Sequence, residues 1–412
     1  MRILAWDINM DFYFVWTPWD EEPEDQYLWE IFPCCDGILL SKGYVTPKLE
    51  ESIVKHGGIH SFLRWKGPVI GDSGAWLYKN QEAPPYSVRE LLEYYVKLKI
   101  PVGAHLDHGI FKTINVDGIR RELTLEEKKK RWQITIDNAR ETMELLQKEK
   151  FNHLKIIGVI QGWDLESYRK AAREILKMGY DYIGIGGIAR RPTSQLVKIV
   201  EVVNKEINKL PTERKKQIKI HLFGFARLRL IPFLMKKRVV SFDTASPLRQ
   251  AWESGEHNYL FANPWRSYTA IRIRLTRVKK VRKGLEKMEK ETLETMYRYA
   301  RNEVSMEHTL NKLLDYERRI LEVDGVEKGK IDKILSVLRK RYVKTLKDRP
   351  WEKCNCPICK EAGVDVIIFR EGWRNGSRAY HNVRQFYLEL KGIKWKEVIS
   401  KINHSGRLSF SF

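Results

Sequence analysis

The chain has 412 residues, of which 43% are hydrophobic, so it can bury more than one core and is not intrinsically disordered. Lysine and arginine number 75 against 53 acidic residues, and the net charge of +22 favours a polyanionic partner, with nucleic acid the first candidate. No apolar run approaches the ~20 residues of a membrane span, and the first residues lack the pattern of a secretory signal, so we expect a cytoplasmic protein with no membrane partner.

Short apolar, β-branched runs alternate with longer segments of helical period through residue 243. Eight of these runs are predicted to be strands: 2–8, 37–41, 68–72, 102–107, 155–161, 182–187, 218–223 and 239–243. Apolar runs separated by helices indicate parallel strands that are buried on both faces. Eight such units close naturally into an α/β fold of the (β/α)₈ TIM barrel type, and an open doubly wound sheet is the alternative.

Helices with recognisable ends lie between several of these strands. Ser87 followed by Glu90, and Thr124 followed by Glu127, have the spacing of a capping box. The amphipathic segment 165–178 stops at Gly179, as a helix C-terminus does. These segments supply the crossover helices that parallel strands need.

The alternation of strands and helices ends after residue 243. Segments 284–304 and 328–346 have helical periodicity, 364–369 is strand-like, and a last segment covers 381–390. Two dense basic runs, 272–283 and 339–344, are typical of surfaces that bind phosphates without reading sequence. We therefore expect a catalytic barrel over residues 1–250 and a basic, helix-rich, zinc-binding extension over residues 251–412.

Three of the five cysteines fall within six positions, at Cys354, Cys356 and Cys359. With His381 downstream they form the complete tetrahedral set that structural Zn²⁺ requires, which leaves no open position for a reactant. His404 also lies downstream and is the alternative fourth ligand. Because such a site is closed, we expect the chemistry to be carried by carboxylates in the first 250 residues. A cysteine content dominated by a metal pattern is typical of a reducing compartment.

Polar residues beside glycine close five of the predicted strands. The five ends read Gly71-Asp72-Ser73-Gly74, Asp107-His108-Gly109, Gln161-Gly162, Gly186-Gly187 and Phe242-Asp243-Thr244. The C-terminal ends of barrel strands form one rim, which holds the active site, and glycine there lets a flat ligand approach the backbone. Two converging carboxylates suit displacement at a sugar anomeric carbon, one attacking and the other handling protons. Asp107 and Gln161 offer complementary groups to a purine edge.

At these residues the chain resembles the tRNA-guanine transglycosylase family. The family's Ser-Asp-Ser-Gly-Gly-Phe resembles residues 71–76, its Phe-Asp-Glu resembles 106–108, its Val-Gln-Gly-Gly resembles 160–163, its Ile-Gly-Gly matches 185–187, and its Phe-Asp-Cys…Pro-Thr-Arg resembles 242–249. The family also has a (β/α)₈ barrel and a zinc subdomain with a Cys-x-Cys-x-x-Cys…His site, whose histidine is commonly followed by Asn, as His381-Asn382 is here. The segments occur in family order over nearly the whole chain.

The resemblance implies a role for each matching residue. Asp243 is the implied nucleophile at C1′, and Asp72 is the implied general acid/base. The implied purine-binding residues are Ser73, Asp107, Gln161, Gly186 and Gly187. The implied ligands of a structural Zn²⁺ are Cys354, Cys356, Cys359 and His381.

Departures from the family pattern indicate a particular branch. Ala75-Trp76-Leu77 stands where the family has Gly-Phe-Gln, Thr244 follows the implied nucleophile in place of Cys, and Leu248 replaces Thr. The N-terminal segment differs from the usual family opening, and the chain ends without the additional RNA-binding domains of archaeal members. These differences resemble the divergent DNA-guanine transglycosylase (DpdA-like) branch, which places 7-deazaguanines in DNA.

The resemblance implies an exchange of guanine in DNA for a 7-deazaguanine, with the 7-cyano form favoured, through a covalent Asp intermediate. The first alternative is the same exchange on tRNA. A guanine-releasing glycosidase, with water in place of the incoming base, is a further alternative. A non-catalytic nucleic-acid-binding accessory subunit is the alternative of another class, and the retained Asp72 and Asp243 argue against it. A homodimer and an ATP-dependent partner protein both stay open.

Overall fold

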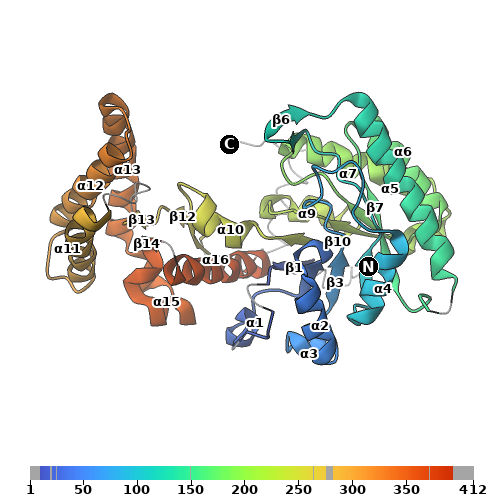
Figure 1. The fold of residues 1–412 in the computed structure, drawn as a ribbon, viewed down its shortest axis with the longest axis horizontal. Coiled ribbons are helices and arrows are strands. Elements are labelled where there is room, and N and C mark those ends of the chain that lie inside the picture. The colour runs from blue at the N-terminus through green and yellow to red at the C-terminus, as the bar shows by residue number, and fades with distance from the viewer. Residues whose placement is uncertain are drawn as a thin grey trace, which may run out of the picture. The chain divides into compact units, whose positions relative to one another are not determined.

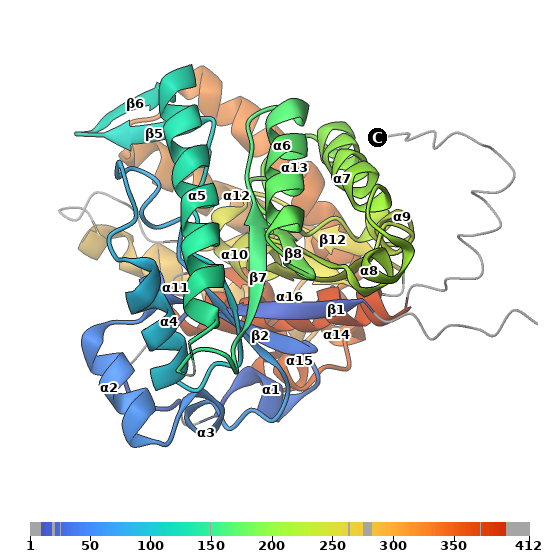
Figure 2. The ribbon, with the colours of Figure 1, turned by 90° about the vertical axis from the view of Figure 1, so that its right-hand side faces the viewer.

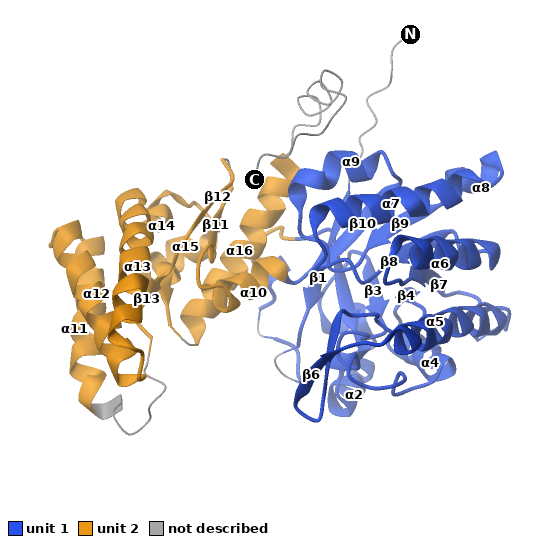
Figure 3. Ribbon diagram, turned by 90° about the horizontal axis from the view of Figure 1, so that it is seen from above, with its two compact units in different colours: residues 1–29, 35–245, 394–412 blue, residues 30–34, 246–393 orange. Residues whose placement is uncertain are grey.

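The computed structural model describes residues 10–18, 21–24, 26–148, 150–262, 264–274, 282–370 and 372–392. Two compact units make up the chain (Figure 3). The first contains residues up to 29 and residues 35–245, and the second contains residues 30–34 and 246–393. None of the helices in the described ranges has both the length and the apolar character that a membrane span requires.

Eight strands close into a barrel in the first unit (Figure 1). They are β1 (Asp11–Trp16), β2 (Gly37–Ser41), β3 (Val69–Asp72), β4 (Val102–Ala104), β7 (Lys155–Ile160), β8 (Tyr182–Ile185), β9 (Lys219–Leu222) and β10 (Val239–Thr244). Every neighbouring pair is parallel, and β1 closes the barrel by pairing with both β2 and β10. The predicted (β/α)₈ TIM barrel is confirmed, and the open doubly wound sheet is excluded.

The first barrel strand begins later than the sequence suggested. The strand predicted at residues 2–8 lies outside the described residues, and the strand that closes the barrel is β1, with the sequence DFYFVW. Aromatic and β-branched residues favour strands because they pack well on a pleated surface. Phe12 on one face of β1 stacks on Phe242, while Tyr13 on the other face joins the interior of the barrel.

Side chains from five strands meet in one buried cluster. Because the sheet is closed, side chains from so many strands can meet only in the interior of the barrel. The members of the cluster are Tyr13, Leu39, Ile70, Ile157 and Tyr182. This layer fills the interior of the barrel, as expected for the fold.

Helices cover the outside of the barrel. They are α2 (Pro47–Lys55), α3 (Ile59–Phe62), α4 (Val88–Lys97), α5 (Leu125–Leu146), α6 (Leu165–Lys177), α7 (Thr193–Asn208), α8 (Thr212–Gln217) and α9 (Ile231–Met235), and Figure 2 shows α5, α6 and α7 side by side. The predicted capping boxes at Ser87 and Thr124 are both formed, and Asp164 opens α6 with a third. An antiparallel hairpin of β5 (Thr113–Val116) and β6 (Ile119–Glu122) stands between β4 and α5.

The second unit is rich in helices, as predicted. It contains α10 (Ser246–Glu253), α11 (Arg282–Ala300), α12 (Met306–Val323), α13 (Lys328–Asp348), α14 (Pro350–Lys353), α15 (Pro357–Ala362) and α16 (Trp373–Gly392). The short strands are an antiparallel pair, β11 (Tyr259–Phe261) with β12 (Arg266–Tyr268), and a parallel pair, β13 (Ile271–Arg272) with β14 (Ile368–Phe369). Helices α11, α12 and α13 pack in chain order (Figure 1).

Two details of this unit differ from the sequence prediction. Helix α12 was not predicted, although Ser305 caps its first turn. The strand predicted at 364–369 is mostly a 3-10 helix over Gly363–Ile367, and only Ile368–Phe369 is extended. Residues 275–281 of the basic run 272–283 lie outside the described residues.

Candidate active site and metal site

The predicted site residues of the barrel lie at or just beyond the C-terminal ends of five barrel strands. Asp72 ends β3, and Asp107 and Gln161 follow β4 and β7. The glycine pair at 186–187 follows β8, and Asp243 is the next-to-last residue of β10. Because all barrel strands are parallel, these residues come to one rim.

Asp107 is the centre of a buried hydrogen-bonded group. The Ser73 hydroxyl donates to Asp107 Oδ1 at 2.6 Å, and Gln161 Nε2 donates to Asp107 Oδ2 at 2.8 Å. The Tyr78 hydroxyl donates to the backbone carbonyl of Asp107 at 2.6 Å. The other amide atom, Gln161 Oε1, is buried and has no hydrogen-bond partner among the described residues. An unpaired buried acceptor is costly, so this oxygen is suited to receive an N–H from a ligand.

Glycine is required at both positions of the pair that follows β8. A Cβ at Gly186 would lie 2.4 Å from Gln161 Nε2, and one at Gly187 would lie 2.9 Å from Gln161 Oε1. Gly187 also has a φ of +70°, a backbone conformation that residues other than glycine rarely adopt. Any larger residue would push the Gln161 amide away from Asp107.

The environment of Asp72 favours its neutral form. Burial raises the pKa of Asp72 to about 7, and the nearby charges of Asp107 and, to a smaller extent, Asp243 act in the same direction. The Ser41 side chain and the Gly74 N–H, which donates to Asp72 Oδ2 at 3.0 Å, oppose this change. Both protonation states are therefore populated near neutral pH, as a general acid/base requires.

Asp243 is buried, and its side chain is held through one oxygen. Oδ1 accepts a hydrogen bond from the Gly224 N–H at 3.2 Å and lies 3.1 Å from His221 Nε2. Within the described part of the chain, no hydrogen bond to Oδ2 accompanies these two. A carboxylate held in this way keeps one oxygen available to attack a reactant.

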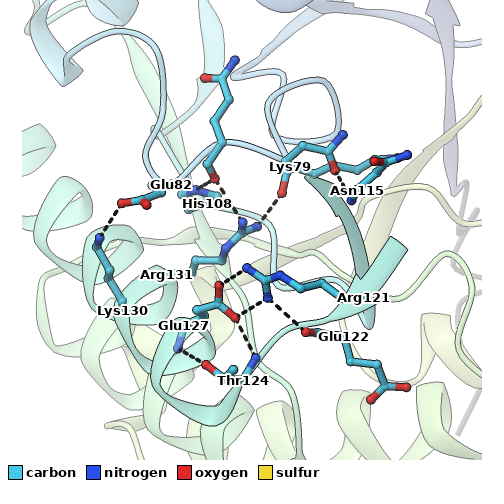
Figure 4. Close-up of polar contacts among 12 residues, drawn as sticks. Lys79, Glu82, His108, Asn115, Arg121, Glu122, Thr124, Glu127, Lys130 and Arg131 are labelled. Carbon is cyan, nitrogen blue, oxygen red and sulfur yellow. Dashed lines mark hydrogen bonds and ion pairs between the residues drawn. The ribbon is translucent and has the colours of Figure 1, made fainter. Parts of the chain in front are cut away.

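Sequence reasoning missed Arg131, a buried arginine of α5. Its guanidinium donates to the carbonyls of Lys79 at 2.8 Å, Gly109 at 3.0 Å and Gln81 at 3.0 Å. Figure 4 shows Arg131 reaching from its helix toward the loop that carries Lys79 and Glu82. Arg131 thus ties together the loops that follow β3 and β4. Nothing in the sequence distinguishes Arg131 from the other charged residues of α5, so its contacts with the two loops could not be predicted.

The predicted metal ligands come together in the second unit. Cys354 follows α14, Cys356 caps α15, Cys359 lies in α15 and His381 lies in α16. All four are buried, and their ligand atoms lie within 4.8 Å of one another. The alternative ligand, His404, lies outside the described residues.

The distances within this cluster fit a tetrahedral ion. His381 Nδ1 lies 3.7, 3.5 and 3.2 Å from the three sulfurs of Cys354, Cys356 and Cys359. Zn–S and Zn–N bonds of ordinary length at tetrahedral angles place sulfur and nitrogen roughly 3.6 Å apart. Three thiolates and one imidazole are also the donor set that Zn²⁺ prefers.

Contacts with β11 fix the orientation of the His381 ring. His381 Nε2 donates to the Leu260 carbonyl of β11 at 2.7 Å, which leaves Nδ1 free to bind a metal. The next residue, Asn382, accepts from the Leu260 N–H at 2.8 Å and donates to the Asn258 carbonyl at 3.0 Å. The ring of Tyr259 stacks on His381 with centroids 4.0 Å apart. Both residues of the His-Asn pair therefore attach α16 to β11.

Comparisons with known proteins identify the family of the chain. A family profile described as "Queuine tRNA-ribosyltransferase" matches residues 36–394. The chain is 31% identical over 391 residues to the "DNA-guanine transglycosylase" of Salmonella montevideo, and the match covers 89% of each protein.

Relatives named for tRNA match over shorter stretches. The "Queuine tRNA-ribosyltransferase" of Acinetobacter baumannii is 25% identical over 224 residues, which is 50% of this chain and 56% of the relative. The "tRNA-guanine(15) transglycosylase" of Methanocaldococcus jannaschii is 29% identical over 218 residues, which is 51% of this chain and 30% of the relative. The resemblance seen in the sequence is confirmed: the chain belongs to the queuine tRNA-ribosyltransferase family and is a guanine transglycosylase.

Proposed function

We propose that this enzyme exchanges guanine in DNA for a 7-deazaguanine, with the 7-cyano form as the incoming base. The observation that carries the choice of DNA is the extent of similarity. The relative named for DNA matches over 89% of both proteins, whereas the two relatives named for tRNA match about half of this chain. The net charge of +22 suits a phosphate backbone of either kind.

In the first half of the reaction, Asp243 acts as the nucleophile. Its Oδ2 attacks C1′ of the target deoxyguanosine, a C1′–Oδ2 ester bond forms, and the C1′–N9 bond breaks. The electron pair of that bond goes to N9 of guanine. The neutral form of Asp72, which its raised pKa keeps populated, supplies the proton that guanine takes up.

In the second half, the same two carboxylates work in reverse. The ionised Asp72 removes the N9 proton of the incoming 7-deazaguanine, and N9 then attacks C1′. The ester bond breaks, and Asp243 is released as a carboxylate. Two successive inversions leave the β-anomer intact, as in retaining glycoside chemistry.

The group around Asp107 is proposed to hold the purine. Gln161 Oε1 is an acceptor that waits for an N–H of the base, while Ser73 and Gln161 Nε2 keep the Asp107 carboxylate in place. The glycine pair at 186 and 187 gives the flat ring access to the backbone. A base can reach this rim only after it leaves the stack of a duplex.

The cysteine cluster is proposed to bind a structural Zn²⁺. Its ligands would be Cys354, Cys356, Cys359 and His381. The ion would link α15 to α16 by coordinate bonds, which would stabilise this part of the unit without a larger apolar core. Its four positions would all be filled by protein, so this site takes no part in the exchange.

The proposed substrate is tested by incorporation of radiolabelled guanine into duplex DNA and into unmodified tRNA at matched salt. We expect label in DNA, and none with Asp243→Ala. Asp137→Asn, an exposed change on α5, is the matched control and keeps full activity. Label in tRNA alone would overturn the DNA assignment and favour the alternative on tRNA. Release of guanine without any added base would favour a glycosidase.

A further inference from the structure

A chain of buried side chains runs behind the proposed nucleophile. His221 Nε2 lies 3.1 Å from Asp243 Oδ1, His221 Nδ1 lies 2.8 Å from Ser241 Oγ, and Ser241 Oγ lies 2.7 Å from the Tyr182 hydroxyl. All four side chains are buried, and His221 is wholly inaccessible to solvent. They come from β8, β9 and β10, which are neighbours in the barrel.

One assignment of protons gives a hydrogen-bond partner to each of these polar atoms of Asp243, His221, Ser241 and Tyr182. An ionised Asp243 can only accept, so His221 Nε2 must carry a proton. If Nδ1 is then unprotonated, the Ser241 hydroxyl donates to it, and Ser241 Oγ accepts from the Tyr182 hydroxyl. Burial raises the pKa of Tyr182 to about 12, so this phenol keeps its proton. If Nδ1 also carried a proton, it would donate to Ser241 Oγ, and then the hydroxyl proton of either Ser241 or Tyr182 would lack an acceptor among the contacts described here.

Aromatic rings fix the plane of the imidazole. Phe223 meets the His221 ring edge-on with centroids 4.7 Å apart, and Tyr13 does so at 5.9 Å. The ring therefore cannot turn away from Asp243 without displacing the interior of the barrel. The donor at Nε2 is held in one direction before any substrate arrives.

We propose that His221, as the neutral Nε2–H tautomer selected by Ser241 and Tyr182, is a positioning residue for the nucleophile. His221 and the Gly224 N–H both donate to Oδ1 of Asp243, and this pair of bonds turns Oδ2 toward the sugar. When the ester has formed, Oδ1 is its carbonyl oxygen and keeps the same two donors. The inference rests on the proposed role of Asp243 as nucleophile, and it adds His221 as the residue that orients the carboxylate.

A pair of substitutions separates positioning from packing. The amide nitrogen of His221→Gln reaches the place of imidazole Nε2 and keeps a donor to Asp243, whereas that of His221→Asn reaches only the place of Nδ1. We expect kcat to fall about 100-fold in His221→Asn with the KM for DNA unchanged, as when one fixed donor is removed from an active site. His221→Gln should recover to within about 10-fold of the wild type. Equal losses in the two variants, or a rise in KM alone, would overturn the proposal.

A second measurement does not depend on activity. The full chain labelled with ¹⁵N-histidine reports the protonation of each ring nitrogen by NMR, and His221→Gln identifies the signals of His221. We expect a protonated Nε2 and a bare Nδ1 in the wild type, and loss of this single tautomer in Ser241→Ala. A proton on Nδ1 in the wild type would contradict the assignment. Absence of exchange in a wild type that shows the expected tautomer would count against the proposed function and leave the tautomer assignment standing.

Discussion

The rim of the barrel and the cysteine cluster are both buried polar groups, and they differ in how completely their atoms are paired. In the cluster, each ring nitrogen of His381 has partners, and Asn382 uses both its oxygen and its amide group. At the rim, Gln161 Oε1 has no partner among the described residues, and Asp72 has a pKa of about 7. A closed set of bonds is typical of a structural site, whereas unused bonding capacity and shifted titration indicate a site that receives a reactant.

The largest effect is expected at the rim. Asp243→Ala should lower exchange by roughly 10⁴-fold or more, because the covalent step loses its proposed nucleophile. The zinc content and the melting temperature should stay close to those of the wild type. Exchange rates and metal analysis of the same preparation check both statements. Exchange near the wild-type rate would show that the rim does not carry the chemistry.

The corresponding change in the cluster should act on stability. Cys359→Ser should release the metal and lower the free energy of unfolding by roughly 5 kcal/mol or more, since metal binding contributes directly to folding. Cys35→Ser removes another buried thiol and is the matched control, with its metal content unchanged. Metal analysis and chemical denaturation measure the two effects. Full metal retention in Cys359→Ser would contradict the assigned ligand set.

A third test uses the pH dependence of stability. The folded-state pKa of Asp72, about 7, lies above the usual value near 3.9, so the folded protein binds more protons than the unfolded chain between these values. The cost of a charged Asp72 is absent below about pH 4 and fully present above about pH 7. Asp72→Asn should therefore be more stable than the wild type above pH 7, by no more than about 4 kcal/mol, and equal to it near pH 4. A stability difference between Asp72→Asn and the wild type that does not change with pH would contradict the raised pKa of Asp72.

The smallest effect is expected beside the cluster. Asn382→Ala loses two buried hydrogen bonds to the β11 segment and should lower the free energy of unfolding by about 1–3 kcal/mol. Exchange by the folded variant should stay within a factor of about two, because no rim residue is touched. Thermal melts and initial rates measured together decide this. A loss of exchange comparable to that of Asp243→Ala would mean that the two sites are not separable in function.

Local signals made most of the barrel predictable from the sequence. The barrel strands other than β1 are short apolar runs, and the capping boxes at Ser87 and Thr124 mark helices by side chains only three residues apart. The strand at β1 was misplaced because residues 2–8 have the same apolar character as Asp11–Trp16. The four candidate metal ligands could be found from the sequence because the Cys-x-Cys-x-x-Cys spacing and a downstream histidine match a known set of Zn²⁺ ligands.

The residues that the sequence did not reveal act through distant partners. Arg131 contacts carbonyls 22 to 52 positions away, and nothing nearby in the chain distinguishes it from the exposed charges of α5. His221 stands in an apolar strand pattern, and its two polar partners belong to the next strand. Such contacts are set by the register of the closed barrel, which local periodicity does not encode.

The closure of the barrel by β1 and β10 has a consequence during synthesis of the protein. Tyr13 pairs with Asp243, about 230 residues later, so the last seam of the sheet joins segments that leave the ribosome far apart in time. A nascent chain that already contains Asp72, Asp107 and Gln161 still lacks Asp243, the carboxylate that we propose as the nucleophile. The ability to cut a glycosidic bond is therefore acquired only when the ring of strands can be completed, and prematurely terminated chains carry none of it.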